Sequence, residues 1–270
     1  MFRSRKIKHI FSLILAAALL FPFNASAAVK GITTPYESLP QDTTMDEYVV
    51  NVNSTNGQPR SYHVFSQGAT TLNEKSYVAI HGCAVSALTT VLTAHSPKYA
   101  HYTPTMTYQT LEKKVFGKKR WRANYSKHPA RQMPVSLYGI TKILSYCGIK
   151  SKYVRKFKDA KAVKQIENHL RKGKPVIIEV NNHRQTNGRI SRKYDKKWAT
   201  TKHTMALLGM TDTGKVIVAD SATRLWSGTN QRIKFTTLSS LVHYMVPARY
   251  KSRSLYYMSI QANGGYVLVN

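Results

Sequence analysis

The chain has 270 residues and an extreme positive charge, because 41 Lys and Arg residues stand against 12 Asp and Glu residues, for a net charge of +29. Two cysteines are too few for a disulfide framework, and no nucleic-acid-binding signature is present. The composition excludes a small disulfide-stapled scaffold. It favours a globular protein whose surface attracts polyanions such as anionic wall polymers or phospholipids.

The N-terminus has the pattern of a secretion signal. An apolar core at 10–23 is followed by a small-residue cleavage site at 25–27, and it is preceded by a basic head that contains Arg3, Arg5, Lys6 and Lys8. The apolar core is too short for a comfortable membrane span. We therefore predict a signal peptide at 1–27 and a secreted or cell-surface protein of bacterial type.

The mature chain divides into a short extension and one sizeable domain. Residues 28–60 are predicted to be a linker or pro-segment that includes part of a β-hairpin, and residues 61–270 the main domain. The hairpin spans 47–65, where two β-branched runs flank a turn rich in Asn, Gly and Pro.

Helical and strand patterns then follow one another along the main domain. Apolar residues at helical spacing predict helices at 107–116, 136–147, 160–171 and 238–244. Strands are predicted at 151–154, 175–180, 203–210, 215–220, 255–260 and 266–269, and loops at 117–134 and 181–202. Helices come first and an antiparallel sheet follows, which is the pattern of an α+β fold.

The stretch 77–92 contains the first candidate catalytic residue. A short apolar run leads to Gly82 and Cys83, and a buried helix is predicted to start at or near Cys83. A thiol at a helix start lies beside unpaired backbone N–H groups and the positive end of the helix dipole, which lower its pKa. We expect Gly82 to let the backbone turn sharply and leave the sulfur reachable. The alternative is that Cys83 is a small buried core residue.

The second cysteine supplies a competing hypothesis. An exported protein can form disulfides, and a bridge between Cys83 and Cys147 would remove the nucleophile. Cys147 lies at the predicted end of a helix, next to Gly148, where a structural role is the simpler interpretation.

The hairpin at 203–220 brings two further candidates together. If Met210 faces Lys215 across the turn, Met205 faces Asp220, and His203 lies on the same face as Asp220, one step along the strand. A carboxylate beside an imidazole fixes its tautomer, so that the other ring nitrogen can take a proton from a nucleophile. Taken alone, His203 and Asp220 are equally compatible with structural roles.

Several short motifs, in this order, resemble the papain-like cysteine peptidases related to bacteriocin-leader (double-glycine) peptidases. They are Ile-His-Gly-Cys-Ala-Val-Ser-Ala-Leu at 80–88, Tyr-Cys-Gly-Ile at 146–149, Gly-Lys-Pro-Val-Ile-Ile at 173–178, His-Thr-Met-Ala-Leu-Leu-Gly at 203–209 and Val-Ile-Val-Ala-Asp-Ser-Ala at 216–222. The resemblance covers about 65–246. It implies a papain-like α+β domain with Cys83 as nucleophile, His203 as general base, Asp220 as orienting residue and Gln67 as oxyanion-hole donor.

The function predicted from these residues is cleavage of an amide bond in a peptide or protein substrate, through a Cys83 thioester. No cofactor is expected, since the chain carries neither a His-Glu-x-x-His metal helix nor a glycine-rich phosphate loop. Two alternatives stay open at this point. The same triad can transfer an acyl group to an amine, and an inert papain-like core can serve as a wall-polymer or polyanion-binding protein.

Overall fold

The computed structural model describes residues 47–53, 59–67, 78, 81–124, 133–181, 185–186, 189–190, 198, 202–222, 232–248, 253–257 and 264–270. The predicted secretion signal lies outside the described residues, as does most of the predicted extension at 28–60 and of the predicted loop at 181–202. No helix within the described ranges is long and apolar enough to cross a bilayer.

A six-stranded antiparallel sheet forms the centre of the molecule. Its strand order is β3-β10-β4-β7-β8-β9. The strands are β3 (Ser151–Val154), β4 (Val176–Asn181), β7 (Lys202–Met210), β8 (Val216–Ala219), β9 (Ile233–Thr236) and β10 (Tyr266–Val269). Two separate two-stranded ladders pair β1 (Glu47–Asn53) with β2 (Pro59–Phe65) and β5 (Gln185–Thr186) with β6 (Arg189–Ile190).

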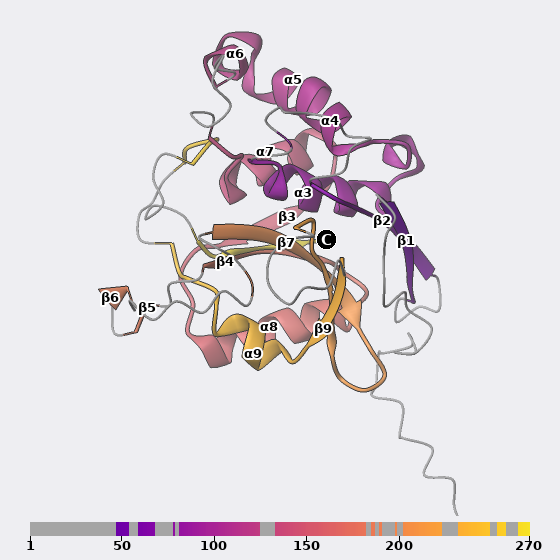
Figure 1. Ribbon diagram of the computed structural model, residues 1–270, viewed down its shortest axis with the longest axis vertical. Helices are drawn as coiled ribbons and strands as arrows, with labels where there is room; N and C mark the ends of the chain where they lie inside the picture. Colours follow the sequence, from indigo (N-terminus) through magenta and orange to yellow (C-terminus); the bar gives the residue numbers. More distant parts are fainter. Residues whose placement is uncertain are drawn as a thin grey trace, which may run out of the picture.

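Helices cover both faces of this sheet (Figure 1). One layer contains α3 (Cys83–Thr93), η3 (Pro97–Tyr99), α4 (Pro104–Met106), η4 (Thr107–Glu112), α5 (Lys113–Phe116), α6 (Lys118–Asn124) and α7 (Leu137–Tyr146). The opposite layer contains α8 (Asp159–Leu170) and α9 (Leu238–Val242). The predicted α+β class is confirmed.

Alternation along the strands explains why both faces are covered. Ile177, Ala206 and Ile217 belong to the core shared with α3 and α7, whereas Ile178 and Val218 belong to the core shared with α8 and α9. Successive side chains of a strand point to opposite faces, so a strand buried on both sides reads as a continuous apolar run. This is how the sequence at 175–180 reads.

Local capping matches the helices that the sequence predicts. The Ser136 hydroxyl accepts a hydrogen bond from the Gly139 N–H at 2.9 Å, which caps the start of α7. Gly148 follows the helix with φ of 78°, a conformation that favours glycine and ends the helix. The predicted helix at 136–147 is therefore confirmed, as are those that correspond to α8 and α9.

The structure departs from the sequence expectations at two places, and one predicted strand is described only in part. The predicted loop at 117–134 contains α6, whose Trp121 packs on Tyr108 and donates to its carbonyl at 3.2 Å, so a tertiary contact holds a basic segment in a helix. Strand β9 was not predicted. In the described part of the predicted strand at 255–260, which is 255–257, Tyr256 forms only an isolated bridge with Val135.

The β7–β8 hairpin follows the predicted register only at the end that carries His203. Ala206 pairs with Ala219 as predicted, but at the turn Met210 pairs with Val216 rather than with Lys215. The two registers differ by one residue, and an irregularity between Leu207 and Gly209 absorbs the difference. Without this bulge, a shift of one residue would have sent Asp220 to the other face of the sheet.

Candidate active site

Cys83 is the first residue of α3, as predicted, and every residue of that helix is buried. The helix starts without a side-chain cap, so the first-turn N–H groups are not occupied by a capping side chain. The thiol therefore lies at the positive end of the helix dipole, with 9% of the residue exposed.

Gly82 is needed for a reason that differs from the predicted one. Its φ of −77° lies in the right-handed helical region, so no unusual backbone angle is involved. Its N–H donates to the Val78 carbonyl at 2.8 Å, and a Cβ on Gly82 would lie 2.1 Å from that carbonyl oxygen. The absence of a side chain, rather than freedom in φ, allows the chain to pass this close before Cys83.

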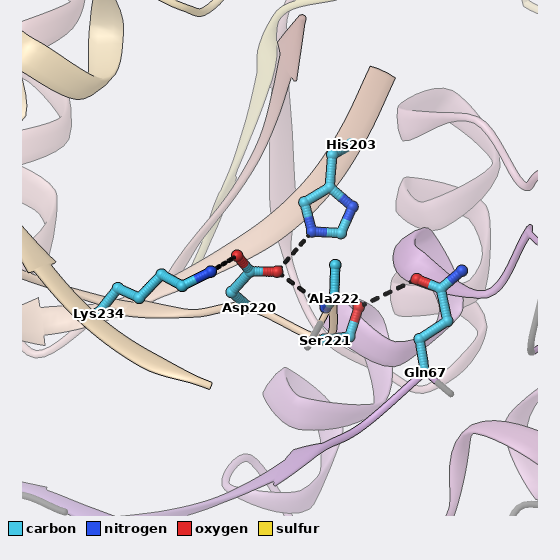
Figure 2. Close-up of polar contacts among 6 residues, drawn as sticks. All are labelled: Gln67, His203, Asp220, Ser221, Ala222 and Lys234. Carbon is cyan, nitrogen blue, oxygen red and sulfur yellow. Dashed lines mark hydrogen bonds and ion pairs between the residues drawn. The ribbon is translucent and has the colours of Figure 1, made fainter. Parts of the chain in front are cut away.

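His203 and Asp220 meet at one end of the sheet (Figure 2). His203 is the second residue of β7, and Asp220 directly follows β8. The His203 Nε2 atom lies 2.6 Å from the Asp220 Oδ1 atom, and 4% and 1% of the two residues are exposed. Because Asp220 occupies Nε2, Nδ1 is the ring nitrogen available to a thiol.

Asp220 has two further partners that fix its orientation. The Ala222 N–H donates to Oδ1 at 2.9 Å, and the Lys234 ammonium, on β9, donates to Oδ2 at 2.5 Å. Burial by itself would raise the pKa of Asp220, but the charge and hydrogen bond of His203, together with Lys234, lower the pKa to about 2. Asp220 is therefore a carboxylate at any physiological pH.

Cys83 and His203 act on each other's protonation. Burial alone would raise the pKa of the Cys83 thiol, yet the hydrogen bond and charge of His203, and hydrogen bonds from Thr204, leave that pKa below its usual value. Burial would lower the pKa of His203, but Asp220 and Cys83 raise it well above its usual value. The arrangement favours a thiolate beside an imidazolium at neutral pH.

Gln67 lies on the other side of this group. It follows β2, and its backbone N–H donates to the Ser221 carbonyl at 2.8 Å. The Ser221 hydroxyl donates to the Gln67 side-chain oxygen at 3.4 Å, so the side-chain oxygen points toward Ser221 and the side-chain nitrogen away from it (Figure 2). The structure thus brings all four residues predicted for the site to the region where α3 meets the sheet.

A comparison with known protein families agrees with this geometry. A family model, that of the Peptidase_C39 like family, matches residues 44–250. The chain belongs to this family. Membership makes it a cysteine peptidase with a papain-like α+β fold, and it confirms the resemblance found in the sequence motifs. No curated protein matches the chain.

Cys147 has no part in the site of this C39-like peptidase. Cys83 and Cys147 are both free thiols, so the disulfide hypothesis was wrong. Cys147 caps the end of α7, and burial raises the pKa of its thiol, with Tyr99 and Lys98 acting in the opposite direction. This is the behaviour of a structural cysteine.

Several polar residues near the site of this C39-like peptidase were not identified from the sequence. Lys234 was missed because β9 is only four residues long and was not predicted. Its alternation of Ile233 and Phe235 with polar residues is a weak strand signal that could have been used. The others, which come from three separate segments and meet only in three dimensions, are Thr204, Glu179 and Tyr257.

Proposed function

We propose that Cys83 is the nucleophile of this peptidase, His203 its general acid and base, and Asp220 the residue that orients the imidazole. One observation carries the proposal: the thiol at the start of α3 contacts an imidazole whose other nitrogen is held by a buried carboxylate 2.6 Å away. A nucleophile, a base and an orienting group in a row are what covalent amide hydrolysis requires.

The steps follow from the protonation states. The Cys83 thiolate attacks the carbonyl carbon of the scissile amide, and the electron pair moves to the carbonyl oxygen. When the tetrahedral intermediate collapses, the C–N bond breaks, and the His203 imidazolium gives its proton to the departing amine. A thioester remains. His203 then takes a proton from water, the resulting hydroxide attacks the thioester, and the free acid leaves as Cys83 is restored.

The oxyanion that forms in each half of the reaction needs hydrogen-bond donors. We assign these to the Cys83 backbone N–H, which belongs to the first turn of α3, and to the Gln67 side-chain amide. The contacts of Gln67 with Ser221, the neighbour of Asp220, support this role because they tie the amide to the same end of the sheet. Donors fixed before the reaction stabilise the developing charge without reorganisation.

The test compares the two thiols. Peptide hydrolysis and labelling by a peptide-based thiol-reactive probe are measured for wild type, Cys83→Ser, Cys83→Ala and the matched control Cys147→Ser. We expect both Cys83 variants to lose probe labelling and at least about a thousandfold in kcat/KM, since a triad acts as a unit. Residual activity of Cys83→Ala near the wild-type value would overturn the assignment, and Cys147→Ser should behave like wild type.

We also propose that the peptidase acts outside the cytoplasm on a peptide or protein substrate. The support is the sequence at 1–27, where a basic head, an apolar core and a small-residue site follow one another. N-terminal sequencing of the protein recovered from culture medium should give a mature chain that starts near Ala28. Recovery of the full-length chain from the cytosol alone would contradict this.

We propose an anionic wall polymer as the partner of the basic surface. Three lysines, Lys161, Lys164 and Lys172, line an open hollow of about 400 Å³ beside α8, on the face of the sheet opposite α3. Binding to a phosphate-rich polymer should weaken steeply with salt, and replacing the three lysines by Glu should weaken it further without changing peptide hydrolysis. Salt-independent binding would exclude this role.

A further inference from the structure

A second group of polar residues reaches Cys83 in addition to His203 and Asp220. Thr204, which follows His203 on β7, hydrogen-bonds to the sulfur through both its backbone N–H and its hydroxyl. It is buried and pairs with Glu179 across β4 and β7. The sulfur therefore has two sets of neighbours, the His203 imidazole and the Thr204 donors.

Behind Thr204 lies a buried cluster that was not predicted. The Tyr257 hydroxyl donates to the Glu179 Oε2 atom, and the Lys202 Nζ atom lies 2.8 Å from the Glu179 Oε1 atom. The same ammonium lies 4.3 Å from the centre of the Tyr257 ring. We call Thr204, Tyr257, Glu179 and Lys202 the Thr204 arm. Like the His203 arm, which ends in Asp220 and Lys234, it ends in a carboxylate paired with a lysine.

The hydrogen atoms of this arm have defined places. Tyr257 gives its hydroxyl hydrogen to Glu179, so its oxygen can act only as an acceptor toward the Thr204 hydroxyl, with which it is also in hydrogen-bonding contact. The Thr204 hydroxyl has a single hydrogen and two acceptors, the Cys83 sulfur and the Tyr257 oxygen. It can serve one of them at a time.

We propose that the Thr204 hydroxyl is a two-position donor that serves the Cys83 thiolate in the resting enzyme and the Tyr257 oxygen once the sulfur is acylated. The proposal rests on the assignment of Cys83 as nucleophile. Tyr257, Glu179 and Lys202 are positioning residues, because they act on the sulfur through Thr204.

The physical basis is the change in charge at the sulfur. A thiolate is an anionic acceptor and attracts a hydroxyl hydrogen more strongly than a neutral phenol oxygen does. A thioester sulfur is neutral and a poor acceptor, so the hydrogen turns to Tyr257. The hydroxyl is buried in both states, and the Tyr257 oxygen prevents it from being left without a partner after acylation.

The test measures how the reactivity of Cys83 depends on pH. In a Cys147→Ser background, the rate of alkylation by iodoacetamide is followed from acid to alkaline pH, and the midpoint reports ionisation of Cys83. Thr204→Val removes the hydroxyl and keeps the shape and the backbone N–H. We expect the midpoint to rise by about 0.5 to 1 pH unit, with an unchanged alkaline plateau.

Tyr257→Phe should act in the opposite direction. It removes the competing acceptor, so the Thr204 hydroxyl serves the thiolate alone and the midpoint falls. In the Thr204→Val background the same change should have no further effect, because Tyr257 acts through Thr204. Tyr266→Phe is the matched control, since it removes a hydroxyl that donates to the Gln165 side-chain oxygen at 2.6 Å, and its midpoint should equal that of the parent.

Other outcomes overturn the proposal. An unchanged midpoint in Thr204→Val, or an upward shift in Tyr257→Phe, would do so. A lower plateau without any shift would show a merely structural role, and Thr204→Ser, which keeps a hydroxyl, should restore the parent midpoint.

Failure of the proposed function looks different. If Cys83 were not the nucleophile, its alkylation in the parent enzyme would show the pH midpoint of an ordinary thiol, and Cys83→Ala would retain peptide hydrolysis.

The substitution of Tyr257 in the Thr204→Val background also separates the proposed change of acceptor by the Thr204 hydroxyl from the effects of nearby charges on the midpoint. The groups that surround the sulfur in the described residues are His203 and Tyr257, with Asp220 and Lys234 behind the first and Glu179 and Lys202 behind the second. A change in any of these charges moves the midpoint whether or not the Thr204→Val substitution is present. The proposed exchange, in contrast, requires the hydroxyl.

Discussion

Asp220, at the end of the sheet, and Glu112, inside the helical layer, are both buried carboxyl groups with opposite properties. Asp220 contacts His203 and Lys234, and these charges lower its pKa to about 2 against the effect of burial. Glu112 ends η4 and is 0% exposed; burial raises its pKa to about 8, and the nearby Tyr256 hydroxyl offsets only part of this effect.

The difference teaches that burial alone makes a carboxyl group neutral, whereas cationic partners make it a permanent anion. Only the second kind can hold an imidazolium during catalysis. The two groups can therefore be used to separate residues that act in the reaction from residues that affect stability.

Asp220→Asn should have the largest effect, because it removes the charge that distinguishes Asp220 from Glu112. The amide keeps the shape but removes the charge that orients and stabilises the His203 imidazolium, so kcat/KM should fall by about a hundredfold to ten-thousandfold. Steady-state peptide hydrolysis measures this, and thermal unfolding checks that the variant is folded. Activity within about tenfold of wild type in a folded variant would contradict the role of Asp220.

Lys234→Met should shift the pKa of Asp220 part of the way toward the raised pKa of Glu112. Loss of the ammonium raises the pKa of Asp220 and weakens its hold on His203, so we expect kcat/KM to fall by about tenfold. The control is Lys215→Met, which removes an exposed lysine from the turn after β7 and should leave kcat/KM unchanged.

The same variant has a stability signature in acid. Because the pKa of Asp220 is lower in the folded chain, its ionised form stabilises the fold above the ordinary value of 3.8, and this stabilisation is lost as pH falls toward about 2. In Lys234→Met the folded-state pKa of Asp220 lies closer to 3.8, so the loss should be smaller in total and should end at a higher pH. Urea unfolding between about pH 2 and pH 6 measures it, and identical curves for Lys234→Met and wild type would count against the Lys234 contact.

Glu112→Gln should alter stability and leave catalysis alone. The pKa of Glu112 is raised in the folded chain, so the folded state holds a proton that the unfolded state releases, and stability falls as pH rises from about 4.5 to about 8. Glu112→Gln lacks this fall. Urea unfolding across that range, with kcat/KM measured in parallel, separates the two effects. The sign would be contradicted if raising the pH stabilised the wild type more than it stabilised Glu112→Gln.

The smallest effect is expected at the other thiol. Burial raises the pKa of Cys147. At Cys83 the hydrogen bond and charge of His203 lower the pKa despite burial, so contacts with neighbouring groups outweigh burial at Cys83 but not at Cys147. Mass spectrometry after brief alkylation at neutral pH should find the label on Cys83. Cys147→Ser should keep kcat/KM within about twofold of wild type, and a larger loss would show that Cys147 contributes to the site.

Much of the site could be predicted because its signals are local. The spacing of apolar residues indicates the helix start at Cys83, and the proximity of His203 and Asp220 follows from alternation along a hairpin. The hairpin prediction placed His203 and Asp220 correctly although it named the wrong residue opposite Met210. The bulge returns the strands to the predicted register at the end that carries His203.

The rest could not be predicted because it depends on packing between distant segments. Lys234 approaches Asp220 only because β9 pairs with β8, and Tyr257 reaches Glu179 from a segment that forms no strand in its described part. The requirement for Gly82 comes from the Val78 carbonyl rather than from its own backbone angles. Beyond the weak alternation in β9, these contacts leave no periodic pattern in the sequence.

The bulge in β7 also makes the far end of the hairpin a place for engineering. Thr213 and Lys215 are exposed in the turn, at the end of the sheet away from His203, and the irregularity between Leu207 and Gly209 lies between the two ends. A peptide tag or fluorophore grafted at Thr213 should therefore report on the enzyme without displacing its reactive groups. The turn of the hairpin is thus an attachment point, and His203 and Asp220 lie at its other end.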